Sequence, residues 1–251
     1  MTRLGLALPM MVATAGCGLF FRAPAPIATI RYSSSSTPAK ELLVLLPGRG
    51  DRARSFADAG VVDIIKRASP ALDVVAVDAT VGYYIHRNLR ERLDLDVIEP
   101  ARSRGYRSIW VAGISMGGLG SLLYAQQYPR AIAGVLLVAP FLGDEDVIAE
   151  IERAGGLALW KPPSTIDPED YQRDLWRWLK SCVTKPGTCP RILLGFGSGD
   201  RFVRAHRLLA AVLPPDQVVE VPGEHAWEPW RLLFTALVPR MDPRRGEDAV
   251  R

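Results

Sequence analysis

The chain has 251 residues, of which 48% are apolar and 8% aromatic, which suffices for one sizeable hydrophobic core. Its 31 basic residues are interspersed with 27 acidic ones, so the formal net charge is only +4. Because the basic residues form no dense run, the composition argues against a nucleic-acid-binding protein.

The first 17 residues are predicted to be an export signal. One basic residue, Arg3, precedes an apolar run over residues 4–15 that is short for a membrane span but suits a secretory signal. The sequence Thr-Ala-Gly-Cys that ends at Cys17 is similar to a bacterial lipobox, in which the cysteine is acylated. We expect a membrane-anchored lipoprotein of the bacterial cell envelope that faces the periplasm. A plain signal peptide cleaved near Ala15, or an uncleaved anchor, is the alternative.

Predicted strands alternate with amphipathic helices through most of the remaining chain. Residues 27–32 alternate apolar and polar side chains, as an edge or hairpin strand does. Apolar runs predict six further strands, at 42–46, 72–79, 107–115, 131–140, 191–197 and 217–223. Helical spacing of apolar residues predicts helices at 55–69, 88–105 (ended or kinked near Pro100), 116–129, 202–213 and 227–237. This alternation is typical of a parallel sheet that is covered by helices on both faces.

Between residues 141 and 190 the alternation stops, which predicts an insertion of helices and loops over the top of the sheet. The insertion contains Trp160, Trp176 and Trp178. Trp160 and Trp176 are the candidate substrate contacts, as the lining of an apolar acyl pocket or as part of a lid. The alternative for these rings is simple packing of the insertion onto the sheet.

Two cysteines of the insertion, Cys182 and Cys189, flank a Pro-Gly turn. In an oxidising compartment, two cysteines brought together by a turn form a disulfide. The disulfide and the export signal therefore support each other. No grouping of cysteine and histidine indicates a metal site, and we expect no metal or cofactor.

The glycine-rich turn Gly113-x-Ser115-x-Gly117 carries the clearest chemistry. It directly follows one predicted buried strand and opens the next helix, as a nucleophile elbow does when it displays a serine above a sheet. Glycines are needed on both sides because side chains there would collide with the neighbouring strand and helix. A strand–helix junction with an incidental serine is the structural alternative.

A serine nucleophile needs a base, and the chain has three histidines. His225 lies in the loop after the last predicted strand, at the carboxyl edge of the sheet where active sites of parallel sheets collect. His86 and His206 are interpreted as surface or helix-face residues. His225 is therefore the candidate base.

The carboxylate that orients the histidine is predicted to be Asp200, which follows the strand at 191–197. Asp144 follows the preceding strand and is the competing candidate; an N-cap of the next helix is the structural alternative for Asp200. The backbone N–H groups of Met116 and Arg49, with Gly50 as the alternative to Arg49, are candidates for an oxyanion hole. Arg49 and Gly50 belong to a second glycine turn, Pro47–Gly50.

With these motifs, the chain resembles the α/β-hydrolase superfamily from about Ile27 to Leu237. The resemblance implies an α/β fold: a mostly parallel central sheet with helices on both faces, and a cap inserted after the sixth strand at about residues 141–190. Residues 18–251 would then form one domain. One departure is Pro47, where many members have histidine, which leaves Arg49 and Gly50 as alternatives for the second oxyanion donor.

The resemblance also implies a serine hydrolase that cleaves a small-molecule carboxylic ester through Ser115, His225 and Asp200 and an acyl-enzyme. Thioesters and peptides are less favoured substrates. The alternatives are an acyltransferase with the same triad and a non-catalytic, lipid-anchored binding protein of the same fold. The sequence leaves the oligomeric state open.

Overall fold

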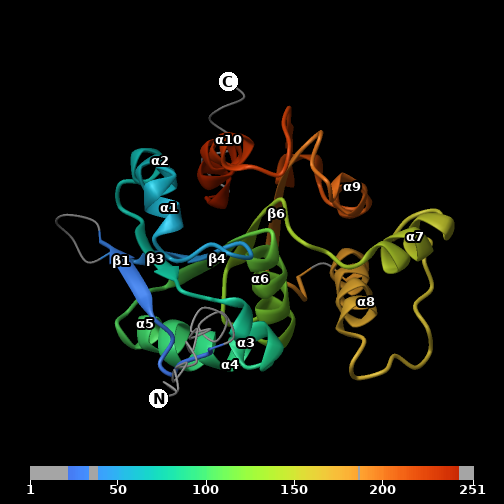
Figure 1. The fold of residues 1–251 in the computed structure, drawn as a ribbon, viewed down its shortest axis with the longest axis horizontal. Helices are drawn as coiled ribbons and strands as arrows, with labels where there is room; N and C mark the ends of the chain where they lie inside the picture. Colours follow the sequence, from blue (N-terminus) through green and yellow to red (C-terminus); the bar gives the residue numbers. More distant parts are fainter. Residues whose placement is uncertain (1–21, 34–38, 186, 243–251) are drawn as a thin grey trace, which may run out of the picture.

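The computed structural model describes residues 22–33, 39–185 and 187–242, and at its centre is a seven-stranded sheet (Figure 1). The strands are β1 (Thr29–Tyr32), β2 (Glu41–Leu46), β3 (Asp73–Val77), β4 (Ser108–Ile114), β5 (Gly134–Val138), β6 (Arg191–Gly197) and β7 (Val218–Val221). Their order across the sheet is β1-β3-β2-β4-β5-β6-β7. All neighbours pair in parallel except β1, which is antiparallel to β3 at one edge. The predicted α/β sheet is confirmed.

Helices cover both faces of this sheet, as the continuous burial of β2 to β6 requires. They are α1 (Ser55–Asp58), α2 (Val61–Ala68), α3 (Val81–Ile85), α4 (Leu89–Leu93), α5 (Glu99–Ser103), α6 (Met116–Gln127), α7 (Glu145–Arg153), α8 (Tyr171–Thr184), α9 (Val203–Ala210) and α10 (Trp227–Leu237), with a π-helical turn η1 (Asp94–Ile98) and two 3₁₀ turns, η2 (Pro215–Gln217) and η3 (Val238–Met241). On one face of the sheet, α1, α2 and α10 pack in one core cluster. On the other face, α3 to α9 contribute to a second core cluster (Figure 1).

The helix predicted at 88–105 is divided, and one further helix was not predicted. The π-helical turn η1 separates α4 from α5, and Pro100 lies in the first turn of α5. Proline has no N–H to donate to the preceding turn. The helix therefore widens into a π-helical turn before Pro100, and this turn divides it. The unpredicted helix is α3, whose five residues are too few for a helical period to be recognised.

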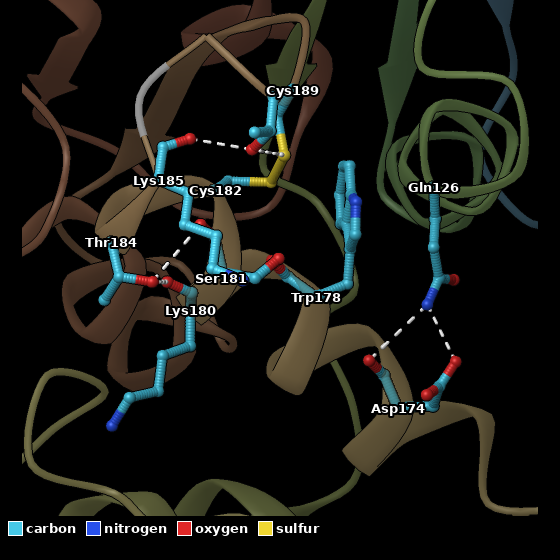
Figure 2. The surroundings of a disulfide bond; sticks show 10 residues. Gln126, Asp174, Trp178, Lys180, Ser181, Cys182, Thr184, Lys185 and Cys189 are labelled. Carbon is cyan, nitrogen blue, oxygen red and sulfur yellow. Dashed lines mark hydrogen bonds between the residues drawn. A yellow bond between two sulfur atoms is a disulfide. The ribbon is translucent and has the colours of Figure 1, made fainter.

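The predicted insertion is present and carries α7 and α8. It follows β5, which is the fifth of the described strands and not the sixth. A disulfide joins Cys182 to Cys189, as predicted, and so connects the end of α8 to the start of β6 (Figure 2).

The predicted export signal, with Cys17, lies outside the described residues. Among the helices that are described, none combines the length and the apolar character that a membrane crossing requires.

Replacing both Cys182 and Cys189 by serine is expected to lower the free energy of unfolding by about 2–3 kcal/mol, because the disulfide closes a short loop and restricts the unfolded chain. Urea titration of the purified protein measures this. Dithiothreitol should destabilise the wild type by the same amount and leave the double variant unchanged. Equal sensitivity of both proteins to the reductant would contradict the prediction.

Candidate active site

The turn from β4 into α6 places Ser115 in a backbone conformation that side chains rarely adopt, with φ 52° and ψ −116°. Such a conformation costs about 1–3 kcal/mol and persists only when its surroundings hold it. Here the Ser115 N–H donates to the carbonyl of Val138 at 3.0 Å, and its carbonyl accepts from the N–H of Phe141 at 2.9 Å and of Gly118 at 3.0 Å. Neighbouring backbone therefore fixes the serine at the amino end of α6, where the helix dipole favours negative charge.

Glycine is required at both flanks of the turn by close backbone contacts. A Cβ on Gly113 would lie 2.1 Å from the carbonyl oxygen of Gly117, and a Cβ on Gly117 would lie 2.1 Å from that of Leu46. The next two glycines let α6 pack closely: a Cβ on Gly118 would meet Pro140 at 2.6 Å, and one on Gly120 would meet the Tyr84 hydroxyl at 2.5 Å. The sequence predicted the need for the first pair, and the structure supplies a reason for both later glycines.

Asp200 and His225 are brought together by the loops after β6 and β7. The Gly199 N–H donates to the Gly223 carbonyl at 2.9 Å, and the absence of a side chain at Gly197 lets that carbonyl approach. As a result, His225 Nδ1 lies 2.7 Å from Asp200 Oδ2.

The Asp200 carboxylate is buried yet well supplied with donors. Burial is the largest influence and would raise the pKa of Asp200, but the hydrogen bonds from His225 and from the Phe202 N–H, at 2.8 Å, together lower it below its usual value. An ionised carboxylate only accepts, so His225 donates through Nδ1 and keeps a lone pair on Nε2. The rings of Phe202 and Trp230 stand nearly perpendicular to the imidazole, at centroid distances of 5.2 and 4.9 Å. The imidazole therefore has one orientation and one tautomer.

Asp144, the competing carboxylate, lies elsewhere. It is exposed at the start of α7, and its Oδ2 accepts from the side chain of Gln172 at 2.7 Å. Among the described residues, the pairing with a histidine thus belongs to Asp200.

The Ser115 hydroxyl makes no hydrogen bond to any described residue, His225 included. Contacts between a nucleophile and its base are often loose until substrate binds. Ser115 and His225 lie at the same edge of the sheet, and the hydrogen bond between nucleophile and base is not formed in this structure.

The turn after β2 passes beside the serine, as an oxyanion hole requires. A Cβ on Gly48 would lie 3.6 Å from the Cβ of Ser115. Within the described chain, neither the Arg49 N–H nor the Met116 N–H donates to a backbone acceptor. Both donors are available, and the Arg49 side chain is exposed to solvent.

The expectation that Trp160 and Trp176 contact substrate is wrong, because both rings are buried inside the insertion. They are 2% and 0% exposed. The Trp160 indole N–H donates to Glu150 at 2.8 Å, and that of Trp176 donates to the Leu142 carbonyl at 2.7 Å. With their polar atoms satisfied, these residues hold the insertion together.

His206, interpreted from the sequence as a surface or helix-face residue, is fully buried. Its Nε2 lies 2.8 Å from the carbonyl of Pro140, so Nε2 carries the proton, while Nδ1 has no partner among the described residues. Pro140 adjoins Phe141, whose N–H binds Ser115, and Ala139, which has φ 46°. His206 therefore anchors the segment that supports the serine turn. Its place on the apolar stripe of α9, with Ala205 and Leu209, was the available sequence signal.

No metal site accompanies these groups: in the described ranges, no three His, Cys, Asp or Glu side chains lie close enough together to hold an ion.

The sequence is similar to a known family of proteins. The Esterase family model matches residues 84–241, more than half of the chain. No curated protein matches the sequence significantly.

Several solved structures share the fold at low sequence identity. The S-formylglutathione hydrolase FrmB from Staphylococcus aureus is 15% identical, with a TM-score of 0.60 over 86% of this chain and 95% of that one. Est1E from Butyrivibrio proteoclasticus is 18% identical, with a TM-score of 0.58 over 90% and 97%. A monoacylglycerol lipase from Paleococcus ferrophilus is 15% identical, with a TM-score of 0.54 over 86% and 99%.

The buried His206 predicts a pH dependence of stability. Burial lowers its pKa to about 4, whereas the unfolded chain titrates near the usual 6.5. Below pH 6.5 the unfolded state binds a proton on this histidine that the folded state does not bind. The free energy of unfolding therefore decreases as pH falls from 6.5 towards 4, by up to about 1.4 kcal/mol per pH unit. His206→Gln, whose amide replaces the Nε2 donor, should flatten this slope in urea titrations at several pH values.

His86→Gln is the matched control, because His86 is exposed. It should keep the wild-type slope. Parallel slopes for wild type and His206→Gln would contradict the assignment of a neutral, buried His206.

Proposed function

The chain belongs to the Esterase family and has the α/β-hydrolase fold, and from this premise we propose that it hydrolyses a carboxylic ester with Ser115 as nucleophile, His225 as base and Asp200 as the carboxylate that orients the base. One observation carries the proposal: the 2.7 Å hydrogen bond between His225 and Asp200, at the sheet edge where the strained turn presents Ser115.

The first step forms the acyl-enzyme. Ser115 Oγ attacks the ester carbonyl carbon while its proton passes to His225 Nε2. The carbonyl oxygen takes up the electron pair of the broken π bond, and the N–H groups of Arg49 and Met116 stabilise this oxyanion. When the pair returns, the ester C–O bond breaks, and the proton on Nε2 goes to the departing alkoxide, which leaves as an alcohol.

Water completes the cycle. His225 Nε2 removes a proton from water as its oxygen attacks the acyl carbon, and a second oxyanion forms in the same place. Its collapse breaks the bond to Ser115 Oγ, which regains the proton from Nε2. The carboxylic acid leaves and the enzyme returns to its starting state.

Fixed charges of the fold favour these steps. Asp200 stabilises the imidazolium that each attack creates, and burial strengthens that interaction. The amino end of α6 stabilises the developing oxyanion. Because the strain at Ser115 is already present in the resting protein, the oxyanion donors need little reorganisation during reaction.

The proposal includes a location. Residues 1–17 direct export, and lipid on Cys17 anchors the enzyme in the cell envelope, facing the periplasm. The Cys182–Cys189 disulfide supports this location, because disulfides persist in oxidising compartments.

Three variants test the reaction with p-nitrophenyl acetate. Ser115→Ala should lower kcat by at least about 10³-fold and abolish labelling by a fluorophosphonate probe. Asp200→Asn should lower kcat by about 10²–10⁴-fold, because the amide favours the wrong histidine tautomer. Asp144→Asn, the matched control, should keep wild-type activity.

Two results would reject the assignments separately. Full activity of Ser115→Ala would reject the nucleophile. A loss in Asp144→Asn that matches the loss in Asp200→Asn would reject the choice of carboxylate. Transfer of the acyl group to an added alcohol, in place of its release to water, would identify an acyltransferase.

Cys17→Ser tests the anchor. Expressed in a bacterial host with labelled fatty acid, the wild type should incorporate label and sediment with membranes, and the variant should do neither. An unlabelled wild-type protein whose amino terminus lies near residue 16 would indicate a plain signal peptide.

A further inference from the structure

A cavity of about 530 Å³ lies beside α6, and none of Ser115, Asp200 and His225 lines it. Its walls come from residues 83–90 around α3 and α4, from α6, and from residues 166–177 of the insertion. Its volume lies within the range of small-molecule sites, about 300–1,000 Å³.

One side of the cavity is apolar. Leu119 and Leu123 face it from successive turns of α6. Ile85 and Tyr171, which also line it, are 54% and 40% exposed, unusually high for large apolar side chains. Apolar groups that stay uncovered around a concave surface indicate a binding site.

Polar contacts hold the walls in place. Arg87, which lines the cavity, pairs with Glu169, and so joins the segment after α3 to the insertion. Gln126 of α6 donates to the carboxylate of Asp174 of α8 at 2.7 Å, and Arg177 pairs with the same carboxylate (Figure 2 shows the Gln126 contacts). The polar groups of these side chains are therefore already paired with one another.

Arg90 differs from the other two arginines of the cavity. It is half-buried, and its side chain has neither an ion pair nor a hydrogen bond within the part of the chain that the structure describes. Among the described residues, Asp167 is the lining carboxylate that has no cationic partner. It is exposed, so water screens its charge, and its Oδ1 accepts from the Glu169 N–H at 2.8 Å. The uncompensated charge inside the cavity is therefore positive.

We propose that this cavity is a second binding site, separate from the catalytic centre, for a small amphipathic organic anion. The anionic group, a carboxylate or sulfonate, pairs with the Arg90 guanidinium, whose planar fork suits two anionic oxygens. The apolar body lies against Leu119, Leu123 and Tyr171.

The inner wall of the site is tied to the serine turn. The Tyr84 hydroxyl donates to the Met116 carbonyl at 3.0 Å and fills the space left by Gly120. Burial raises the pKa of Tyr84 well above its usual value, so the hydroxyl stays protonated and keeps donating. The site therefore has a rigid floor that the resting protein already forms.

The probe for a test is 8-anilinonaphthalene-1-sulfonate, an aromatic anion that fluoresces when bound. Arg90→Gln should weaken its binding about tenfold, whereas Arg67→Gln, at an exposed arginine of α2, should leave the Kd unchanged. Leu123→Trp fills the cavity and should abolish binding; Ile85→Ser, at an exposed position where folding is not at risk, should weaken it about threefold.

A covalent block of Ser115 tests whether the sites are separate. Phenylmethanesulfonyl fluoride forms a sulfonyl ester with the Ser115 oxygen and releases HF, and the adduct is verified by mass. The adduct should bind the probe with the wild-type Kd. Equal Kd values for Arg90→Gln and Arg67→Gln, or loss of binding in the adduct, would overturn the proposal. A serine that forms no adduct would speak against the proposed function alone, because the Arg90 and Ile85 comparisons need no reaction.

Discussion

The close approach of three backbone segments at the serine turn is the constraint on which the site depends. The carbonyl of Leu46 from β2 and that of Gly117 from α6 occupy the positions that side chains would take at Gly117 and Gly113. Ser115 can hold its left-handed conformation only because β5 and the segment after it bind its N–H and carbonyl. The same approach puts the Gly48 turn beside the serine. One packing arrangement thus positions both the proposed nucleophile and the proposed oxyanion donors.

Two histidines near one buried carboxylate have different physical states. His225 donates to Asp200, and its other nitrogen is available for proton transfer. His206 donates to a carbonyl, and burial keeps it neutral, so it places no positive charge next to Asp200. If both rings were protonated, they would repel each other and weaken the pairing on which the proposed base depends. The fold thus leaves His225 available as the proposed base and uses His206 to anchor the backbone that supports the serine turn.

The insertion has two roles. Its buried tryptophans and the disulfide make it a packed unit, and its segment from residue 166 to 177 forms a wall of the cavity beside α6. The sequence suggested that aromatic residues of the insertion form a ligand surface, but the larger rings pack inside. The accessible side chains around the cavity are those of Ile85, Tyr171 and Arg90. Size and apolar character favour burial first, and only residues that packing leaves uncovered can bind a ligand.

The sequence alone determined the alternation of strands and helices, the serine turn, and the placement of Ser115, Asp200 and His225 at one edge of the sheet, because these depend on local spacing and on the rule that parallel strands end at one edge. The division of the helix at 88–105 was only partly visible, through Pro100. Tertiary structure alone decided that Asp200 and not Asp144 meets His225, that His206 and the two tryptophans are buried, and that the Arg90 side chain has no partner among the residues the structure describes. Those outcomes depend on which side chains from distant segments come into contact, and a local pattern carries no information about that.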